Sequence, residues 1–281
     1  MEIQLNKFNM NMINDDAVVV FIGKRNTGKS YLIKDLLYHK RSFPIGIVVS
    51  ATEGANNFYS KIIPSMFIHS KFSNELVGNV LKRQQLIKKN TSQEDKRTFF
   101  IMDDMMSVAN QWVKSENVAN MFCNGRHYGC LFILSLQYVM GVPPVFRNNV
   151  DFVFILKENI YKSKKKLHEH WAGIFPDYKM FEAVLEECTQ NYECIVIKNN
   201  SLSNKIEDCV FWYKAEKCDD FQVCLKKYWD LDAEISKNKK NKHSSKVEKE
   251  EGSIDVNDIT KLTCDHNTCT TTGNFYVSKN K

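Results

Sequence analysis

The sequence predicts an α/β fold, a doubly wound and mostly parallel sheet, followed by a poorly ordered C-terminal tail. Three observations support this prediction. Short apolar runs alternate with longer amphipathic stretches along the chain. Each run is apolar at successive positions, which suits central strands covered by helices on both faces. A glycine-containing loop, Gly23 to Ser30, joins the first run to a helical pattern.

The predicted strands are runs of four to seven residues, rich in Val, Ile, Leu and Phe. They are Val18–Ile22, Ile45–Ser50, Met66–His69, Thr98–Met102, Cys130–Leu136, Phe152–Leu156 and Cys194–Ile197. Between the first two runs, residues 30–39 follow a helical period, and Phe43-Pro44 closes the segment. The apolar face of this helix consists of Leu32, Ile33, Leu36 and Leu37.

Composition separates a folded part, residues 1–235, from a tail, residues 236–281. The whole chain of 281 residues carries 39 basic and 33 acidic residues, a net charge of +6, and is 43% hydrophobic. These values exclude a wholly disordered, collagen-like or coiled-coil chain. The tail holds nine Lys and six acidic residues but few large apolar side chains. Such a segment buries too little apolar surface to offset its ordering entropy, so we expect low order there.

Apolar runs in the chain are short. The longest, Ala17–Ile22 and Cys130–Leu134, fall well below the roughly 18 residues that a membrane-spanning helix requires. Residues 1–11 lack the basic, apolar and small-residue regions of a secretory signal. We therefore expect no membrane span, no secretion, and reduced cysteines.

One loop matches the phosphate-binding pattern G-x-x-x-x-G-K-[ST] at every fixed position. Its residues are Gly23, Lys24, Arg25, Asn26, Thr27, Gly28, Lys29 and Ser30. A buried strand precedes the loop and a helix follows it, as this motif requires. The glycines let backbone N–H groups converge on phosphate oxygens, and the helix N-terminus adds its positive end. Lys29 is expected to reach the β and γ phosphates of ATP, and the Ser30 hydroxyl to hold Mg²⁺.

Two carboxylates end the strand Thr98–Met102. The carboxyl ends of parallel strands meet at the nucleotide side of such a sheet. Asp103 is therefore expected to hold the Mg²⁺ shell, mostly through water. Asp104 is expected to orient or deprotonate the water that attacks the γ phosphate. An acidic pair in a solvated turn is the alternative interpretation of this segment.

The next strand, Cys130–Leu136, ends in Gln137, whose amide could hydrogen-bond the γ phosphate or the attacking water. It begins about 27 residues after Asp103, with space for one helix, as expected for a strand adjacent to the carboxylate strand. An additional strand between the loop strand and the carboxylate strand would mark one branch of the P-loop ATPases.

Together these segments resemble the genome-packaging ATPases of large nucleocytoplasmic DNA viruses, the poxvirus type, within the FtsK–HerA superfamily of P-loop NTPases. The resemblance covers about residues 15–215, and its most specific parts are Asn124-Gly125-Arg126-His127 and Arg147-Asn148-Asn149-Val150-Asp151. It implies ATP hydrolysis by a ring or other homo-oligomer that moves double-stranded DNA into a preformed capsid. Partners would be capsid or portal-like viral proteins, and the location the virion and host cytoplasm.

Arginines are the residues through which an oligomer would act on the nucleotide. A guanidinium that reaches the γ phosphate from a neighbouring subunit neutralises developing charge and contributes a rate factor of about 10³ to 10⁵. Arg147 is the first candidate and Arg126 the second, each as a finger in trans or a sensor in its own subunit. Arg25, inside the loop, is the third. For DNA contact, the basic cluster Lys162–Lys166 is the densest in the folded part.

Other functions remain open at this stage. A P-loop nucleotide or small-molecule kinase would use the same loop, but no acceptor signature is recognisable. A nucleotide-binding structural protein of the virion would bind without turnover. A GTPase is disfavoured, because the closest segment to its guanine-reading motif, Asn204-Lys205-Ile206-Glu207, ends in the wrong residue.

Overall fold

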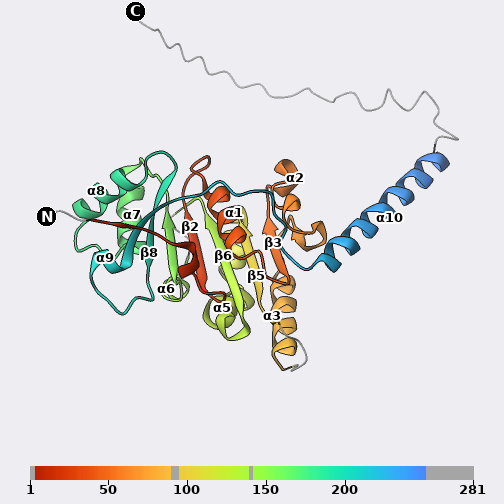
Figure 1. Cartoon of the computed structure of the whole chain (residues 1–281), viewed down its shortest axis with the longest axis horizontal. Coiled ribbons are helices and arrows are strands. Elements are labelled where there is room, and N and C mark those ends of the chain that lie inside the picture. The colour runs from red at the N-terminus through yellow and green to blue at the C-terminus, as the bar shows by residue number, and fades with distance from the viewer. Residues whose placement is uncertain (1–3, 90–94, 139–141, 251–281) are drawn as a thin grey trace, which may run out of the picture. The chain divides into compact units, whose positions relative to one another are not determined.

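The computed structural model describes residues 4–89, 95–138 and 142–250. In this part of the chain nine strands form one sheet, in the order β1-β9-β8-β7-β2-β6-β5-β3-β4 (Figure 1). The strands are β1 (Asn6–Lys7), β2 (Val18–Ile22), β3 (Gly46–Ser50), β4 (Ile68–His69), β5 (Thr98–Asp103), β6 (Cys130–Leu136), β7 (Phe152–Ile155), β8 (Glu193–Lys198) and β9 (Val210–Lys214).

Most neighbouring strands run parallel, as predicted. The exceptions are β7 with β8 and β8 with β9, which pair antiparallel. At the centre, β6 lies between β2 and β5: Val20 is paired with Leu134, and Ile101 with Ile133. The additional strand between the loop strand and the carboxylate strand is therefore confirmed.

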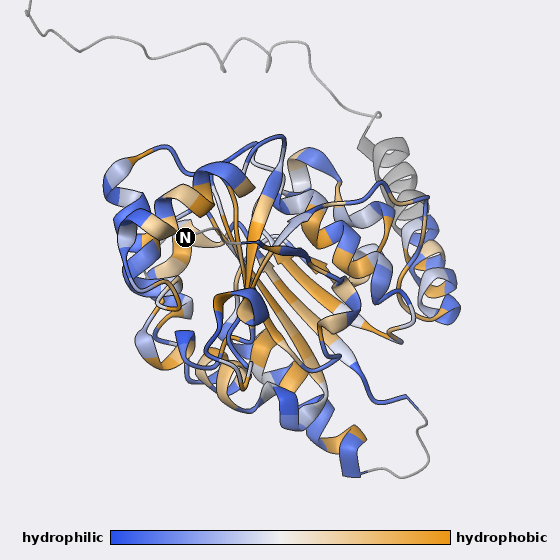
Figure 2. Ribbon diagram, turned by 60° about the vertical axis from the view of Figure 1, so that its left-hand side comes forward, coloured by the Kyte–Doolittle hydropathy of each residue, from blue (hydrophilic) through white to orange (hydrophobic). Residues whose placement is uncertain are grey.

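Helices cover both faces of the sheet, and two apolar cores result. Val18, Val20 and Ile22 of β2 belong to the core on one face, whereas Val19 and Phe21 belong to the other. Figure 2 shows the apolar strands running between more polar helices. The helices are α1 (Lys29–His39), α2 (Glu53–Asn56), α3 (Asn74–Lys89), α4 (Ala109–Trp112), α5 (Glu116–Asn124), α6 (Pro144–Arg147), α7 (Tyr161–Trp171), α8 (Tyr178–Cys188), α9 (Ile206–Cys209) and α10 (Lys226–Glu250).

The predicted elements differ from the structure mainly at the sheet edges. The helix after the loop buries the four apolar residues predicted for it. The predicted run Met66–His69 contributes only the two residues of β4, because Ser65–Phe67 form a 3₁₀ turn. The edge strand β1 and the strand β9, which continues the sheet by antiparallel pairing, were not predicted. No helix among the described residues is long and apolar enough to cross a membrane.

A first compact unit ends at Asp232. The predicted boundary between residues 235 and 236 lies inside α10. Residues 251–281 of the predicted tail lie outside the described residues. The division of the chain into an ATPase domain and a low-order tail therefore stays a prediction.

Candidate active site

The loop between β2 and α1 has the backbone that a phosphate site needs. Gly28, the N-cap of α1, has φ of 104° and ψ of 7°, a left-handed conformation that favours glycine. A Cβ atom on Gly23 would lie 2.7 Å from Thr27 Oγ1 and 2.8 Å from Leu156 Cβ, so a larger residue there would force these neighbours to shift. The geometry therefore favours glycine at both positions of the motif. The N-terminal residues of α1 line a cavity next to the loop. The positive end of the helix dipole favours an anion there.

Lys29 is held inside the loop. Its Nζ donates to the carbonyl oxygens of Gly23 at 2.5 Å and Lys24 at 2.8 Å. Burial lowers the pKa of the Lys29 amine, whereas the carboxylates of Asp103 and Asp104 act in the opposite direction. These backbone carbonyls are acceptors that phosphate oxygens can replace, so the amine is placed to exchange them for a bound anion.

Two further contacts stabilise the loop: a hydrogen bond inside it and an ion pair with a residue outside it. The Thr27 hydroxyl donates to the Lys24 carbonyl at 2.7 Å. The Lys24 amine forms an ion pair of 2.5 Å with Glu158, which follows β7. Lys24 is thus directed toward Glu158, and its side chain does not line the cavity above the loop. Of the predicted loop residues, Arg25, Asn26, Gly28, Lys29 and Ser30 do line it.

Asp103 ends β5, opposite Ser50 of β3 in the register. Its side chain is 6% exposed, and the hydroxyl of the buried Tyr59 donates to its Oδ2 at 2.9 Å. Burial raises the pKa of the Asp103 carboxyl, and the charge of Asp104 adds to this, while the hydrogen bond from Tyr59 and the amine of Lys29 lower it. The neutral Tyr59 hydroxyl therefore orients the Asp103 carboxylate. The surrounding groups do not fully offset the cost of keeping this buried carboxylate charged.

Asp104 lies beyond the strand in a sharp turn. Its φ is 54°, which a residue with a Cβ rarely adopts and which costs about 1–2 kcal/mol. The Gln137 amide, from the end of β6, donates a hydrogen bond to the Asp104 carboxylate. Because β6 is the parallel neighbour of β5, this pair forms at the carboxyl ends of the strands, where the loop also lies. The structure thus brings together Lys29, Ser30, Asp103, Asp104 and Gln137 in one cavity.

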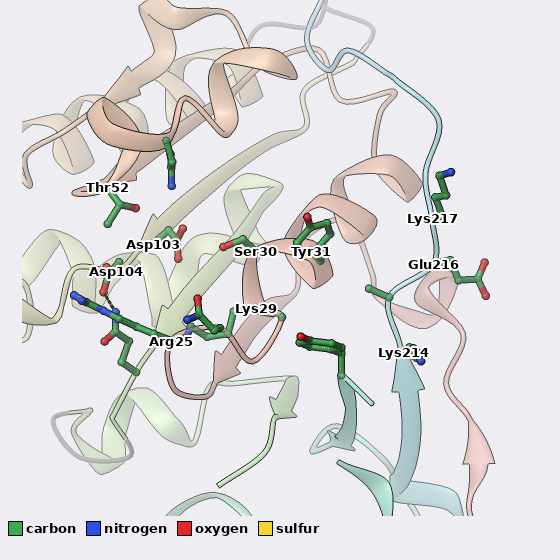
Figure 3. Close-up of a pocket in the computed structure, with 16 residues that line it drawn as sticks. Arg25, Lys29, Ser30, Tyr31, Thr52, Asp103, Asp104, Lys214, Glu216 and Lys217 are labelled. Carbon is green, nitrogen blue, oxygen red and sulfur yellow. Dashed lines mark hydrogen bonds between the residues drawn. The ribbon is translucent and has the colours of Figure 1, made fainter. Parts of the chain in front are cut away.

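That cavity has a volume of about 960 Å³. Figure 3 shows Lys29 and Ser30 in its middle and the two carboxylates at one end. Sequence reasoning missed several of its lining residues, namely Tyr31, Thr52, Asn56, Tyr192 and Lys214–Lys217. Tyr31 could have been found from its position directly after Ser30. The others come from distant segments that carry no motif, and only the fold brings them to the loop.

The three candidate arginines lie in different places. Arg25 lines the cavity and is exposed. Arg126 instead contacts Asp151 at 3.0 Å, and the same carboxylate accepts the backbone N–H of Val18 at 2.8 Å. Val18 begins β2 and the loop follows the fifth residue of this strand, so the ion pair lies about 16 Å from the loop, at the opposite, amino end of the strand.

Arg147 likewise lies away from the cavity. Its guanidinium donates to the carbonyl oxygen of His170 at 3.1 Å and lies 6.0 Å from the ring of Trp171. Within the described part of the chain, neither Arg147 nor Arg126 lines the cavity. In this structure neither residue is placed beside the loop of its own chain, so the sensor role stays a prediction that the geometry does not support. A role toward a neighbouring copy stays a prediction.

The basic cluster on α7 is partly committed to packing. Lys164 is buried and pairs with Glu186 at 2.5 Å and Glu182 at 3.1 Å of α8. These hydrogen bonds raise the pKa of the Lys164 amine. Lys162, Lys165 and Lys166 are exposed. The cluster therefore offers fewer free cations than its sequence suggests.

Proteins with similar sequences come from large DNA viruses. The chain is 36% identical over 240 residues to protein L437 of Acanthamoeba polyphaga mimivirus, a match that covers 81% of this chain and 84% of that protein. It is 35% identical over 224 residues to protein 088R of Invertebrate iridescent virus 3, covering 78% of this chain and 85% of that one. No protein-family model matches the chain.

A solved structure with a similar fold is the genome packaging NTPase B204 of Sulfolobus turreted icosahedral virus 2 in complex with ATP-gammaS. The superposition has a TM-score of 0.51 at 18% sequence identity, and covers 72% of this chain and 98% of B204. At this identity the likeness shows the fold. The chain therefore belongs to the family of large nucleocytoplasmic DNA virus proteins that includes L437 and 088R, and it has the α/β fold of a viral genome-packaging NTPase.

Proposed function

We propose that this protein is an ATP-hydrolysing motor that translocates double-stranded viral DNA into the capsid during virion assembly. The observation that carries the proposal is the arrangement in the cavity, where Lys29 and Ser30 face the carboxylates of Asp103 and Asp104. The fold likeness to B204, a genome packaging NTPase, supports the same class of function.

The donor set of the cavity fits a Mg²⁺ ion. The Ser30 hydroxyl and the Asp103 carboxylate are oxygen ligands of the kind that Mg²⁺ prefers, and both line the cavity beside the loop. Asp103 has one oxygen engaged by Tyr59, which leaves the other for a ligand or a bound water. When bound, the metal would neutralise charge on the β and γ phosphates. Its charge would also offset the cost of keeping Asp103 ionised while buried.

Hydrolysis would then depend on Asp104 and Gln137. The Asp104 carboxylate is the candidate base, because it lies beside Asp103 and its charge acts on the Lys29 amine. It would orient the attacking water and accept its proton. The hydrogen bond from Gln137 holds the carboxylate in place, so Gln137 would act through Asp104 or on the water itself. Lys29 would exchange its carbonyl partners for phosphate oxygens and stabilise their charge in the transition state.

A ring of identical copies would complete the site. Arg25 is the arginine that already lines the cavity and can reach a phosphate within its own subunit. Arg126 and Arg147 could reach a nucleotide only from a neighbouring copy, since both lie away from the loop of their own chain. We propose one of these two as the trans arginine. Capsid or portal-like proteins would be the other partners, in the virion and the host cytoplasm.

The decisive test is ATP turnover measured with and without duplex DNA. Wild type should hydrolyse ATP, and Lys29→Ala should remove the activity in both conditions. If Lys29→Ala leaves turnover unchanged, a contaminating enzyme accounts for it and the proposal fails. Phosphate transfer to an acceptor other than water would instead identify a kinase. ATP binding without any turnover would favour a structural protein of the virion.

Two measurements test the motor itself. The mass of the complex on duplex DNA with a non-hydrolysable ATP analogue should correspond to several copies, whereas a monomer would argue against a ring. DNA affinity should fall steeply with salt if phosphate contacts carry it. The exposed Lys162, Lys165 and Lys166 are the first residues to replace. Salt-insensitive binding would contradict an electrostatic grip on DNA.

A further inference from the structure

The cavity is elongated, and its two ends differ in chemistry. Figure 3 shows Asp103 and Asp104 at one end, segment Lys214–Lys217 at the other, and Lys29 with Ser30 between them. A triphosphate on the loop with its γ phosphate beside the carboxylates therefore directs its nucleoside toward the other end. This step rests on the proposed function. The residues at that end decide which nucleoside is bound.

Two exposed tyrosines lie at this nucleoside end. Tyr31 is 70% exposed and Tyr192 is 69% exposed, and both line the cavity. Tyr192 packs against the loop itself, since its Cδ1 lies 3.7 Å from the place of a Cβ on Gly28. Single exposed aromatics are common on protein surfaces. Two in one cavity, next to a phosphate loop, form a surface on which a planar base can stack.

The backbone around Tyr192 places its ring in the cavity. Asn191 and Tyr192 have φ of 49° and 65°, left-handed values that residues with a Cβ seldom adopt. The turn is closed by the Glu193 N–H, which donates to the Gln190 carbonyl at 2.8 Å. Cys194, two residues further, is fully buried in β8. The turn thus sends Tyr192 outward over the loop just before the chain enters the core.

The segment Lys214–Lys217, which lines the nucleoside end, is hydrogen-bonded to α1, the helix that follows the phosphate loop. Asp35 of α1 is 1% exposed, and its carboxylate accepts the Tyr213 hydroxyl at 2.6 Å and the Glu216 N–H at 3.1 Å. The Cys218 thiol lies 3.6 Å from its other oxygen. Because Asp35 and the loop share α1, the segment Lys214–Lys217 keeps a fixed distance from the phosphate site. The nucleoside end of the cavity is therefore held in place by buried hydrogen bonds to Asp35.

We propose that this end binds the base of a purine nucleoside triphosphate, with Tyr192 as the stacking surface and Tyr31 as a second aromatic residue of the same cavity. Stacking on an aromatic ring is available to every base, but its strength grows with the area of the base. Two fused rings cover more of Tyr192 than one ring does. The site therefore prefers purine over pyrimidine triphosphates.

Calorimetric titration with two probes tests the proposal: a non-hydrolysable ATP analogue, and inorganic tripolyphosphate, which has no base, both with Mg²⁺. Tyr192→Ala should weaken binding of the analogue by roughly 5- to 150-fold and leave tripolyphosphate binding within about twofold. Tyr192→Phe should bind the analogue like wild type, because the ring is kept. Tyr161→Ala, which removes an exposed tyrosine of α7 outside the cavity, is the matched control.

Three results would overturn the inference. One is an unchanged affinity of Tyr192→Ala for the ATP analogue. Another is an equal loss for both probes, which would mean that the substitution damages the phosphate loop. The third is a wild type that binds tripolyphosphate as tightly as the analogue. A wild type that binds the analogue better but hydrolyses no ATP would refute the motor and support the base site, so the two failures are distinguishable.

Discussion

Replacing Asp104 by Asn changes the chemistry of the cavity while keeping its shape. Asn has the same number of heavy atoms as Asp, and its carbonyl oxygen can still accept the hydrogen bond from Gln137. What is lost is the negative charge and the ability to take a proton from water. The free energy of unfolding should therefore change by less than about 1 kcal/mol.

The expected loss of rate follows from the role of the carboxylate. General-base catalysis contributes about 10² to 10⁴ to a rate, so kcat should fall by that factor, roughly 3–5.5 kcal/mol of barrier. Nucleotide affinity should stay the same or rise a few-fold, since a negative charge is removed near the γ-phosphate position. Lys29 is half-buried in the loop and keeps its carbonyl partners, so its phosphate contacts should persist.

Turnover at saturating ATP and the dissociation constant for a non-hydrolysable analogue are the two measurements required. Asp220→Asn is the matched control, because it removes an exposed carboxylate that does not line the cavity. A kcat within threefold of wild type would refute the assignment of Asp104. So would a loss of affinity as large as the loss of rate, because that result indicates a damaged site.

Three further predictions concern the support of the site. Tyr59→Phe removes a hydrogen bond that lowers the pKa of Asp103, so the acid limb of kcat/KM against pH should move to higher pH; an unmoved limb would contradict the contact. Burial raises the pKa of Asp103 above its unfolded value, so its protonated form favours folding at acid pH and this stability is lost as pH rises through the folded pKa. Asp103→Asn should therefore raise Tm at pH 7 in nucleotide-free protein, by about 2–4 °C per kcal/mol, with a smaller gain at pH 4; a lower Tm at pH 7 would count against this reasoning. Gly23→Ala forces a Cβ against Thr27 and Leu156 and should cost about 1–3 kcal/mol in urea unfolding, whereas wild-type stability would mean that the loop relaxes.

Local pattern was sufficient for most of the sheet. Val18–Ile22 is apolar at every position and Cys130–Leu136 at every position but Ser135, and the structure buries both runs completely. Pattern was insufficient at the edges, where β1 has two exposed residues and owes its strand conformation to pairing with β9. The antiparallel direction of β8 likewise could not be predicted from local pattern. It depends on how α7 and α8, which connect β7 to β8, direct the chain into the next strand.

In the candidate site, local motifs likewise predicted some residues well, whereas the positions of others depended on distant parts of the chain. Residues in contiguous motifs, such as Lys29 and Asp104, could be predicted because a phosphate loop and a strand end impose local requirements on type and spacing, and the structure places both in one cavity. Arg126 and Arg147 were predicted to act on a nucleotide, either in trans or in their own subunit, because they flank the strand that ends in Gln137. In the folded chain their guanidinium groups are occupied by Asp151 and the His170 carbonyl instead. Side-chain partners at a sequence distance above 20 residues are set by packing, which no short motif encodes.

The sequence by itself determined the fold class and predicted the loop and the two carboxylates of the cavity, since strand burial, glycine backbone freedom and helix N-termini are local physical demands. Only the tertiary structure decided the end of the cavity that is formed by distant segments. Tyr192 and Lys214–Lys217 reach the loop because β8 and β9 extend the sheet and Asp35 anchors the chain after β9. Such long-range contacts depend on the path of the whole chain, so no segment taken alone could reveal them.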